Sequence, residues 1–475
     1  MINSEEFREY AHRFVDWMTD YFENIESYPV ESSVHPGDVI GQLLLSPPEE
    51  GESIEEIFND FKNLILPGIS HWQSPGWMAY FPANTSYPSV LAEMLTATLG
   101  AQCMLWETSP AAAELEERMM EWLKSAMSLP EHFTGVIQDT ASTATLCALL
   151  SAREKATGFS INRNGFDPRH KFRIYASGAS HSSVEKAVRI AGFGQENLVK
   201  IQVDEKQSMR SDILEIAIVK DAEKGFIPLA VVATLGTTGT MAMDPLKDIA
   251  VICQKHKLWL HVDAAFAGSA AVLPEYRWIF EGLGGADSYV FNPHKWLFTN
   301  FDLSAYYVRD KEALIRTFSI LPEYLKTDFD SQVNNYRDWG IPLGRRFRAL
   351  KLWFVLRNFG LDRIRQILRK HIRNIHELAE KMKQDPMVEF LAPVRLNMIC
   401  FRFRPDRYTE KNLNDLNQHI LHRVNASGLI YLTHTKIEGR YTIRIISGQT
   451  YTENKHLETA WGLLKQAALN ETRHD

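Results

Sequence analysis

The sequence lacks the features that define several classes of protein. Only four of its 475 residues are cysteine, they lie far apart, and no C-x-x-C pair occurs. A disulfide framework or a cysteine zinc site is therefore not expected. The protein is instead expected to reside in a reducing cytoplasm. The 52 Lys and Arg residues are outnumbered by 59 Asp and Glu, a formal net charge of −7, so nucleic-acid binding is not expected. No apolar run approaches the roughly 18 residues of a membrane-spanning helix, so no membrane partner is expected either.

The common nucleotide and metal motifs are also missing. The chain contains no P-loop and no H-E-x-x-H, and the glycines at 282, 284 and 285 do not have the G-x-G-x-x-G spacing. His371 and His376 are five residues apart and would not share a helix face, so we expect no metal site. With 45% hydrophobic and 23% charged residues, the composition is that of a large packed protein, and we expect a cytoplasmic enzyme.

The central part of the chain alternates short apolar runs with amphipathic stretches. This alternation predicts an α/β fold with a mostly parallel sheet covered by helices on both faces. Ligands of such sheets bind at the carboxyl ends of the strands. The predicted strands are Gly135–Gln138, Phe172–Ala176, Val199–Val203, Leu229–Leu235, Trp259–Val262, Ser288–Phe291 and Ser304–Val308.

Three domains are expected from the length and from shifts in pattern. Residues 1–85 form a helical segment with much apolar surface and no obvious core, which we expect to pack across a dimer. Residues 86–365 form the large α/β domain, and residues 366–475 a small α+β domain. Residues 322–340 are polar and aperiodic, which is typical of a functional lid or a disordered segment.

Two charged residues follow predicted strands in unusual surroundings. Lys295 stands between His294 and a Trp-Leu-Phe run, where it is either an ordinary snorkelling lysine or a buried amine with a lowered pKa, able to form a Schiff base. Asp263 directly follows the predicted strand 259–262 and is itself followed by small residues. It could cap a turn or hold a cationic ring nitrogen.

Two further motifs lie where strands end. Hydroxyl residues cluster at 140–145, where a helix begins, and could be N-caps or a phosphate cradle that includes Ala141 and Ser142. His181 follows the strand at 172–176. A lysine, an aspartate, a phosphate cradle and a histidine on one sheet are what pyridoxal 5′-phosphate requires, since its aldehyde needs an amine and its pyridinium a carboxylate.

The residues 292–296, Asn-Pro-His-Lys-Trp, closely match the signature of the group II pyridoxal-phosphate-dependent amino-acid decarboxylases. The similarity extends over nearly the whole chain and is closest to the aromatic-L-amino-acid decarboxylases. It includes His-Trp-x-Ser-Pro at 71–75, Ala-Tyr-Phe-Pro at 79–82, Leu-Gly-Thr-Thr at 235–238, His-Val-Asp-Ala-Ala at 261–265 and Ile-Pro-Leu-Gly-Arg-Arg-Phe-Arg at 341–348. The resemblance implies the aspartate-aminotransferase-like fold (fold type I).

The resemblance also implies a role for individual residues. Lys295 would bind the cofactor aldehyde, Asp263 would keep the pyridine nitrogen protonated, and His181 would stack on the ring. Tyr336 would match the family's catalytic tyrosine and return a proton to the substrate. Other cofactor contacts would come from Ala141, Ser142, Thr238, Asn292 and His294.

The family further implies a homodimer with active sites at the interface, and a pocket for an aromatic substrate. Ala83 stands where aromatic decarboxylases often have a threonine that bonds a ring hydroxyl, and Gly344 stands where a glycine leaves room for larger rings. The pocket residues implied in this way are Trp72, Tyr80, Phe81, Pro82, Ala83, Met104 and Gly344.

The expected activity is decarboxylation of an aromatic L-amino acid to the corresponding amine and carbon dioxide. Two alternatives stay open at this point. One is a decarboxylase of another L-amino acid, such as histidine. The other is an aromatic acetaldehyde synthase, although relatives of that type replace the loop tyrosine or the stacking histidine, and this chain keeps Tyr336 and His181.

Overall fold

A computed structural model describes residues 2–320, 329 and 332–473. Its centre is a seven-stranded sheet with the order β1-β7-β6-β5-β4-β2-β3. The five strands from β6 to β3 run parallel, and β7 pairs antiparallel with both β6 and β1. All seven predicted strands are present: β1 Thr134–Gln138, β2 Phe172–Ser177, β3 Leu198–Ile201, β4 Ile227–Thr234, β5 Trp259–Asp263, β6 Ser288–Phe291 and β7 Ser304–Val308.

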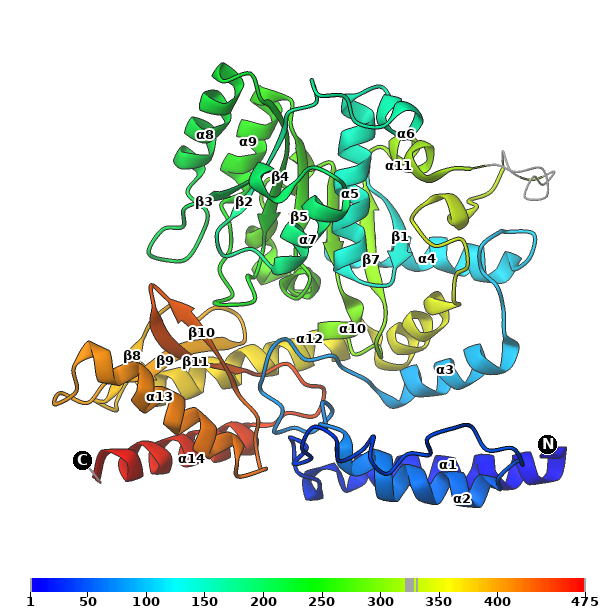
Figure 1. Cartoon of the computed structure of the whole chain (residues 1–475), viewed down its shortest axis with the longest axis vertical. Helices are drawn as coiled ribbons and strands as arrows, with labels where there is room; N and C mark the ends of the chain where they lie inside the picture. Colours follow the sequence, from blue (N-terminus) through cyan, green and yellow to red (C-terminus); the bar gives the residue numbers. More distant parts are fainter. Residues whose placement is uncertain (1, 321–328, 330–331, 474–475) are drawn as a thin grey trace.

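Helices cover both faces of this sheet, as predicted (Figure 1). Alternate residues of β4 face opposite sides of the sheet. Val231 and Ala233 join the core beneath the helices Ser211–Glu223 and Leu246–His256, whereas Ala230 and Val232 join the core beneath the helices Ala141–Ala156 and Ser182–Ile190. The helices of this part are α4 Pro110–Met127, α5 Ala141–Ala156, α6 Ser160–Asn164, α7 Ser182–Ile190, α8 Ser211–Glu223, α9 Leu246–His256, α10 Pro293–Trp296 and α11 Lys311–Phe318.

The N-terminal helices form a separate layer, coloured dark blue at the bottom of Figure 1. They are α1 Ser4–Glu23 and α2 Ile54–Asp60, and α3 Tyr87–Leu99 follows them. The side chain of Asn3 caps α1 in a capping box with Glu6. None of the 20 residues of α1 is buried, and Phe7 is 61% exposed. Phe14 and Trp17 pack against Phe58 of α2, with ring centres 4.6 and 6.0 Å apart, so the apolar face of α1 is only partly covered within one chain.

The C-terminal part contains a four-stranded antiparallel sheet of order β10-β11-β9-β8 and its own hydrophobic core. The strands are β8 Val388–Phe390, β9 Met398–Phe403, β10 Thr433–Ile437 and β11 Arg440–Ile446. The apolar runs 397–403 and 441–446 of the sequence predict β9 and β11, and no such run predicts β8 or β10. The helices are α12 Arg348–Met382, α13 Glu410–Asn425 and α14 Asn454–Arg473.

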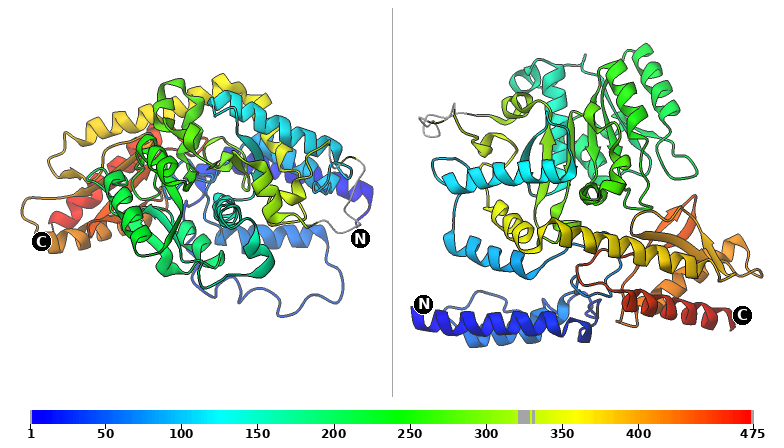
Figure 2. Two further views of the ribbon diagram at one scale, coloured as in Figure 1. Left: turned by 90° about the horizontal axis from the view of Figure 1, so that it is seen from above. Right: turned by 180° about the vertical axis from the view of Figure 1, so that it is seen from behind.

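The long helix α12 runs beneath the large sheet and on into the C-terminal part (Figures 1 and 2). It kinks at Gly360, whose φ of 66° and ψ of 160° are not helical. The domain boundary predicted at 365/366 lies inside this helix and stays a prediction. Among the residues that the structure describes, no helix is long and apolar enough to cross a membrane.

Candidate active site

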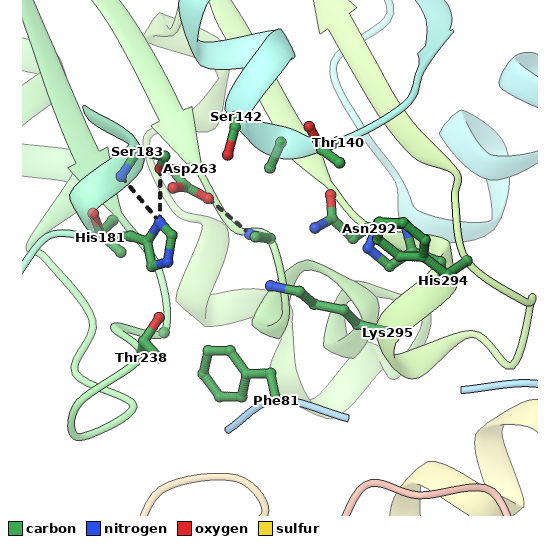
Figure 3. A pocket seen from close by; sticks show the side chains of 15 residues that line it. Phe81, Thr140, Ser142, His181, Ser183, Thr238, Asp263, Asn292, His294 and Lys295 are labelled. Carbon is green, nitrogen blue, oxygen red and sulfur yellow. Dashed lines mark hydrogen bonds between the residues drawn. The ribbon is translucent and has the colours of Figure 1, made fainter. Parts of the chain in front are cut away.

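A cavity of about 190 Å³ lies at the carboxyl ends of the parallel strands, where the fold places ligands (Figure 3). Nine of the residues predicted from the sequence line it together, although they come from separate loops and helix starts. They are Phe81, Ala141, Ser142, His181, Thr238, Asp263, Asn292, His294 and Lys295.

Lys295 is held by the short helix α10, which begins directly after β6. Its ammonium nitrogen lies 5.3 Å from the centre of the Phe81 ring. Loss of water around the amine lowers the pKa of Lys295 to about 8, although the nearby Asp263 carboxylate acts in the opposite direction. A larger fraction of this amine is therefore neutral near pH 7 than of an exposed lysine, and the neutral amine is the form that attacks an aldehyde.

Asp263 is the last residue of β5 and is 4% exposed. Its Oδ1 accepts a hydrogen bond of 3.0 Å from the backbone N–H of Ala265. The carboxylate is thus fixed in one orientation at the cavity wall, as Figure 3 shows. A buried carboxylate in this position can bind a protonated ring nitrogen.

His181 is the N-cap of α7, and its Nδ1 accepts a 3.2 Å hydrogen bond from the backbone N–H of Ser183. The neutral ring therefore carries its proton on Nε2. Burial lowers the pKa of His181; the Asp263 carboxylate opposes that effect and Lys295 adds to it. The ring is neutral at pH 7, and its face can lie against a flat ligand.

The opposite end of the cavity is built to bind an anion. The first turn of the 16-residue helix α5 lies there, with Thr140 as its N-cap, and the N–H groups of a first turn have no partner within the helix. Asn292 Oδ1 accepts a 2.6 Å bond from Ser304 Oγ, and His294 Nδ1 accepts a 2.9 Å bond from the N–H of Leu303. Burial lowers the pKa of His294 to about 3, so this imidazole is neutral and its Nε2–H is a donor.

These groups fit pyridoxal phosphate. The cavity has an amine of lowered pKa in its middle, a buried carboxylate on one side and the first turn of helix α5 on the other. Those are the partners that an aldehyde, a pyridinium and a phosphate require. Among the described residues, no group of three or more His, Cys, Asp or Glu is placed to hold a metal ion.

Seven predicted residues lie outside this cavity, and Tyr336, Gly344 and Met104 are three of them. Tyr336 is 2% exposed, packs against Trp339 at 5.3 Å, and lies under the Arg345 guanidinium at 4.9 Å. Gly344 lines a different cavity of about 320 Å³, and the backbone oxygen of Met104 accepts a 3.0 Å bond from the N–H of Arg337. The role of Tyr336 as proton donor stays a prediction, and residues 322–328 and 330–331 of the predicted loop lie outside the described part.

The aromatic segment 71–83 is irregular, as its Pro and Gly content predicts, and only part of it reaches the cavity. Phe81 stacks on Phe266 with ring centres 4.3 Å apart. Trp72 and Tyr80 stack at 5.8 Å but remain 36% and 44% exposed. Of the other two predicted pocket residues, Pro82 is buried and Ala83 accepts a bond from Gln73 through its backbone oxygen.

The sequence interpretation missed several lining residues. Thr234 and Gly236 follow the same rule as Asp263, because they lie at the carboxyl end of β4, and that rule could have found them. Thr140 belongs to the hydroxyl cluster noted at 140–145, and Ser183 lies two residues after His181. Phe301 is a 58% exposed loop residue, and no sequence pattern pointed to it.

The fold and this cavity define a pyridoxal-phosphate enzyme, and comparison with known proteins specifies which. The model of the pyridoxal-dependent decarboxylase conserved domain matches residues 36–404. Phenylacetaldehyde synthase of Arabidopsis thaliana is 40% identical over 98% of this chain and 96% of its own. Tryptophan decarboxylase 2 of Oryza sativa subsp. japonica is 39% identical over 98% of this chain and 95% of its own.

Among solved structures, that of Oryza sativa TDC with PLP and tryptamine superposes with a TM-score of 0.95 and 32% identity, covering 99% of both chains. The chain therefore belongs to the pyridoxal-dependent decarboxylase family. It has the predicted fold, and its cofactor is pyridoxal 5′-phosphate.

Proposed function

We propose that this enzyme removes the carboxyl group of an aromatic L-amino acid and releases the amine and carbon dioxide. The observation that carries the proposal is the single cavity in which Lys295, Asp263 and the first turn of α5 meet. The aromatic substrate is supported by relatives at 38–40% identity, which include tryptophan and tyrosine decarboxylases.

In this proposal each lining residue has a defined task. Lys295 binds the cofactor aldehyde covalently, and Asp263 holds a proton on the pyridine nitrogen through a charge-assisted hydrogen bond. His181 lies against the ring, and Thr238 contacts the cofactor. The phosphate end is held by Ala141, Ser142, Asn292 and His294.

When bound, the cofactor supplies an electron sink for the pair released as the bond between Cα and the carboxylate breaks. Asp263 makes that sink effective because its fixed negative charge keeps the ring protonated. His181 and Phe81 limit the positions that the substrate can take beside Lys295. A general acid must then deliver a proton to Cα. Tyr336 is the residue proposed for that step.

The substrate end of the site leads us to propose a homodimer. Met104 and Gly344 lie outside the cofactor cavity of their own chain, so a second copy would have to bring them to it. One face of α3 supports this, since it leaves four large apolar side chains 46–63% exposed: Tyr87, Leu91, Leu95 and Leu99. The cytoplasmic location expected from the sequence also stays a proposal, supported by four buried, unpaired cysteines.

The test is the product formed from a panel of free amino acids. The purified holoenzyme is incubated with tryptophan, tyrosine, DOPA, phenylalanine, histidine and glutamate, and carbon dioxide and amine are measured in parallel. We expect equimolar amine and carbon dioxide from at least one aromatic substrate. Release from histidine or glutamate alone would refute the aromatic assignment.

A second candidate is an aromatic acetaldehyde synthase, favoured by the 40% identity to phenylacetaldehyde synthase. That reaction consumes dioxygen and water and yields aldehyde, carbon dioxide, ammonia and hydrogen peroxide. The same incubations therefore separate the two functions, because only the synthase produces peroxide and depends on oxygen.

The proton donor is tested by comparing two tyrosines of the segment 322–340. Tyr336→Phe should lose amine and gain aldehyde with hydrogen peroxide. Tyr324→Phe, at a position outside the described residues, is the matched variant. If only Tyr324→Phe changes the product, Tyr336 is not the acid.

A further inference from the structure

A second cavity, of about 530 Å³, lies away from the cofactor, between α12 and the segment 450–453. We call it the α12 groove. The helical residues that line it lie mostly at three- and four-residue spacing on one face of α12, with Arg369 and His371 at the two edges of that face. They are Phe359, Arg363, Gln366, Ile367, Arg369, Lys370, His371 and Arg373, and the opposite wall consists of Thr450, Tyr451, Thr452 and Glu453.

Positive charge dominates this groove. Four of its lining residues are cationic, and Glu453 is the one carboxylate among them. Lys370 pairs with Glu453 at 3.2 Å, and Arg369 pairs with Glu275 at 2.7 Å. Arg373 is 3.9 Å from Glu377, and Arg363 makes no ion pair with any residue in the described ranges. The groove therefore holds cations beyond those that neighbouring carboxylates neutralise.

The spacing of the cations indicates what kind of anion would fit. Arg363 and Arg373 are ten residues apart on one helix, which corresponds to about 15 Å along its axis. A single small anion cannot contact both ends of such a row. A molecule with two or more phosphate or carboxylate groups can do so, because the two arginine side chains can extend toward each other along the row.

The far wall of the groove is connected to the peptide that carries Lys295. Thr450 donates to Asn84 Oδ1 from its backbone N–H at 2.8 Å and from its hydroxyl at 3.0 Å. The Asn84 side-chain amide donates to the backbone oxygen of Lys295, and the Asn84 N–H donates to the backbone oxygen of His294 at 2.9 Å. One side chain thus links the groove wall to the cofactor lysine.

The floor of the groove makes a second connection. His371, which is fully buried, accepts a 3.0 Å bond at Nδ1 from the indole N–H of Trp296, the residue after Lys295. Trp296 stacks on Phe266 at 4.9 Å, and Phe266 stacks on Phe81 in the cofactor cavity. Movement of either wall of the groove would therefore be transmitted to the surroundings of Lys295.

We propose that the α12 groove binds a small organic or inorganic polyanion and that its occupancy changes the environment of Lys295. Binding requires neither catalysis nor a particular amino-acid substrate. Because thermodynamic coupling is reciprocal, the state of the cofactor lysine would in turn change the affinity of the groove for the anion.

The test uses the holoenzyme, in which the cofactor already fills the phosphate end of the active site. Pyrophosphate, with orthophosphate as the comparison, is titrated calorimetrically at constant ionic strength. We expect one saturable site per chain that prefers pyrophosphate. The double variant Arg363→Gln/Arg373→Gln should weaken pyrophosphate binding by about tenfold or more, since it removes two charge-assisted contacts. Arg357→Gln, an exposed arginine of the same helix outside the groove, is the matched control.

Coupling between the α12 groove and Lys295 is measured by following the absorbance of the lysine-bound cofactor as a function of pH. Pyrophosphate should shift the midpoint of that titration in the native enzyme, and should shift it less in Thr450→Val, which lacks the hydroxyl bond to Asn84. Equal binding by the double variant and the Arg357 control would overturn the site. Saturable binding with an unchanged midpoint would overturn its connection to Lys295.

Discussion

The cofactor end and the substrate end of the active site differ in how many of their residues a single chain contributes. At the cofactor end, the residues proposed to hold pyridoxal phosphate line one cavity of a single chain, and their supporting hydrogen bonds are made within that chain. At the substrate end, Met104 and Gly344 lie elsewhere, Trp72 and Tyr80 are partly exposed, and α3 presents an uncovered apolar face. We therefore propose that cofactor binding is encoded in one chain and that substrate recognition is divided between two.

The largest expected effect lies at the cofactor end. Lys295→Ala removes both the covalent attachment of the aldehyde and an amine able to transfer protons, so kcat should fall by about 10³-fold or more. The measurement is carbon dioxide release, together with loss of the borohydride-reducible cofactor. Lys224→Ala, at an exposed lysine, is the control. Lys351 is not used for this purpose because it is buried and paired with Glu93. Native turnover by Lys295→Ala would refute the assignment.

The second-largest expected effect concerns the substrate end of the active site. Leu91→Asp places a charge in the middle of the exposed apolar face of α3, where Leu91 is 52% exposed. We expect the dimer to dissociate and activity to be lost with it, because a buried unpaired charge is strongly unfavourable. Light scattering gives the mass. Ile190→Asp, at a residue 62% exposed on α7, is the control and should remain dimeric. A monomeric native enzyme with full activity would contradict the divided site.

Mixing inactive variants tests the division directly. Lys295→Ala and Met104→Asp are denatured, combined in equal amounts and refolded. If each site draws Lys295 from one chain and Met104 from the other, half the dimers are mixed and each has one intact site. Activity should then recover to about one quarter of the native value. No recovery, with mixed dimers demonstrated, would place both residues in the same chain's site.

The smallest effect concerns stability against acid. Burial lowers the pKa of each of His261, His294 and His371 to about 3, whereas an unfolded histidine titrates near 6.5. Between these values the unfolded chain binds more protons, so stability falls as the pH is lowered through that window. Each histidine should contribute about 1.4 kcal/mol per pH unit well below 6.5.

Denaturant unfolding at several pH values measures this slope. His261→Gln should reduce it by the share of one histidine, whereas His376→Gln, at an exposed position, should leave it unchanged. An identical slope in both variants would show that the buried imidazoles of the cofactor-binding part do not control acid stability.

The sequence predicted best what depends on local pattern. Seven strands of the large sheet were expected within a few residues, because apolar runs between turn signals are short-range features. Lys295 and Asp263 were found because each follows a strand, and parallel strands bring their carboxyl ends to one edge. Strands β8 and β10 were missed, since they are partly exposed and polar residues interrupt their apolar pattern.

What the sequence could not predict depends on contacts between distant segments. The two helical runs of α12 meet at Gly360, whose positive φ is a local signal for a helix end, whereas the way the second run continues from the first is decided by packing on both sides. Phe301 reaches the cavity only because of the path of the loop that carries it. The position of Tyr336 is likewise set by its contacts with Trp339 and Arg345.

The reversal of the chain after β6 has a consequence for the order in which the site forms. Because β7 returns antiparallel beside β6, the groups that orient Asn292 and His294 come from Ser304 and Leu303, only nine to twelve residues away. Contacts of such short sequence separation form early and need no distant partner. The backbone around the lysine should therefore be protected from hydrogen exchange in the apoenzyme, and the cofactor would then enter a site that is already organised.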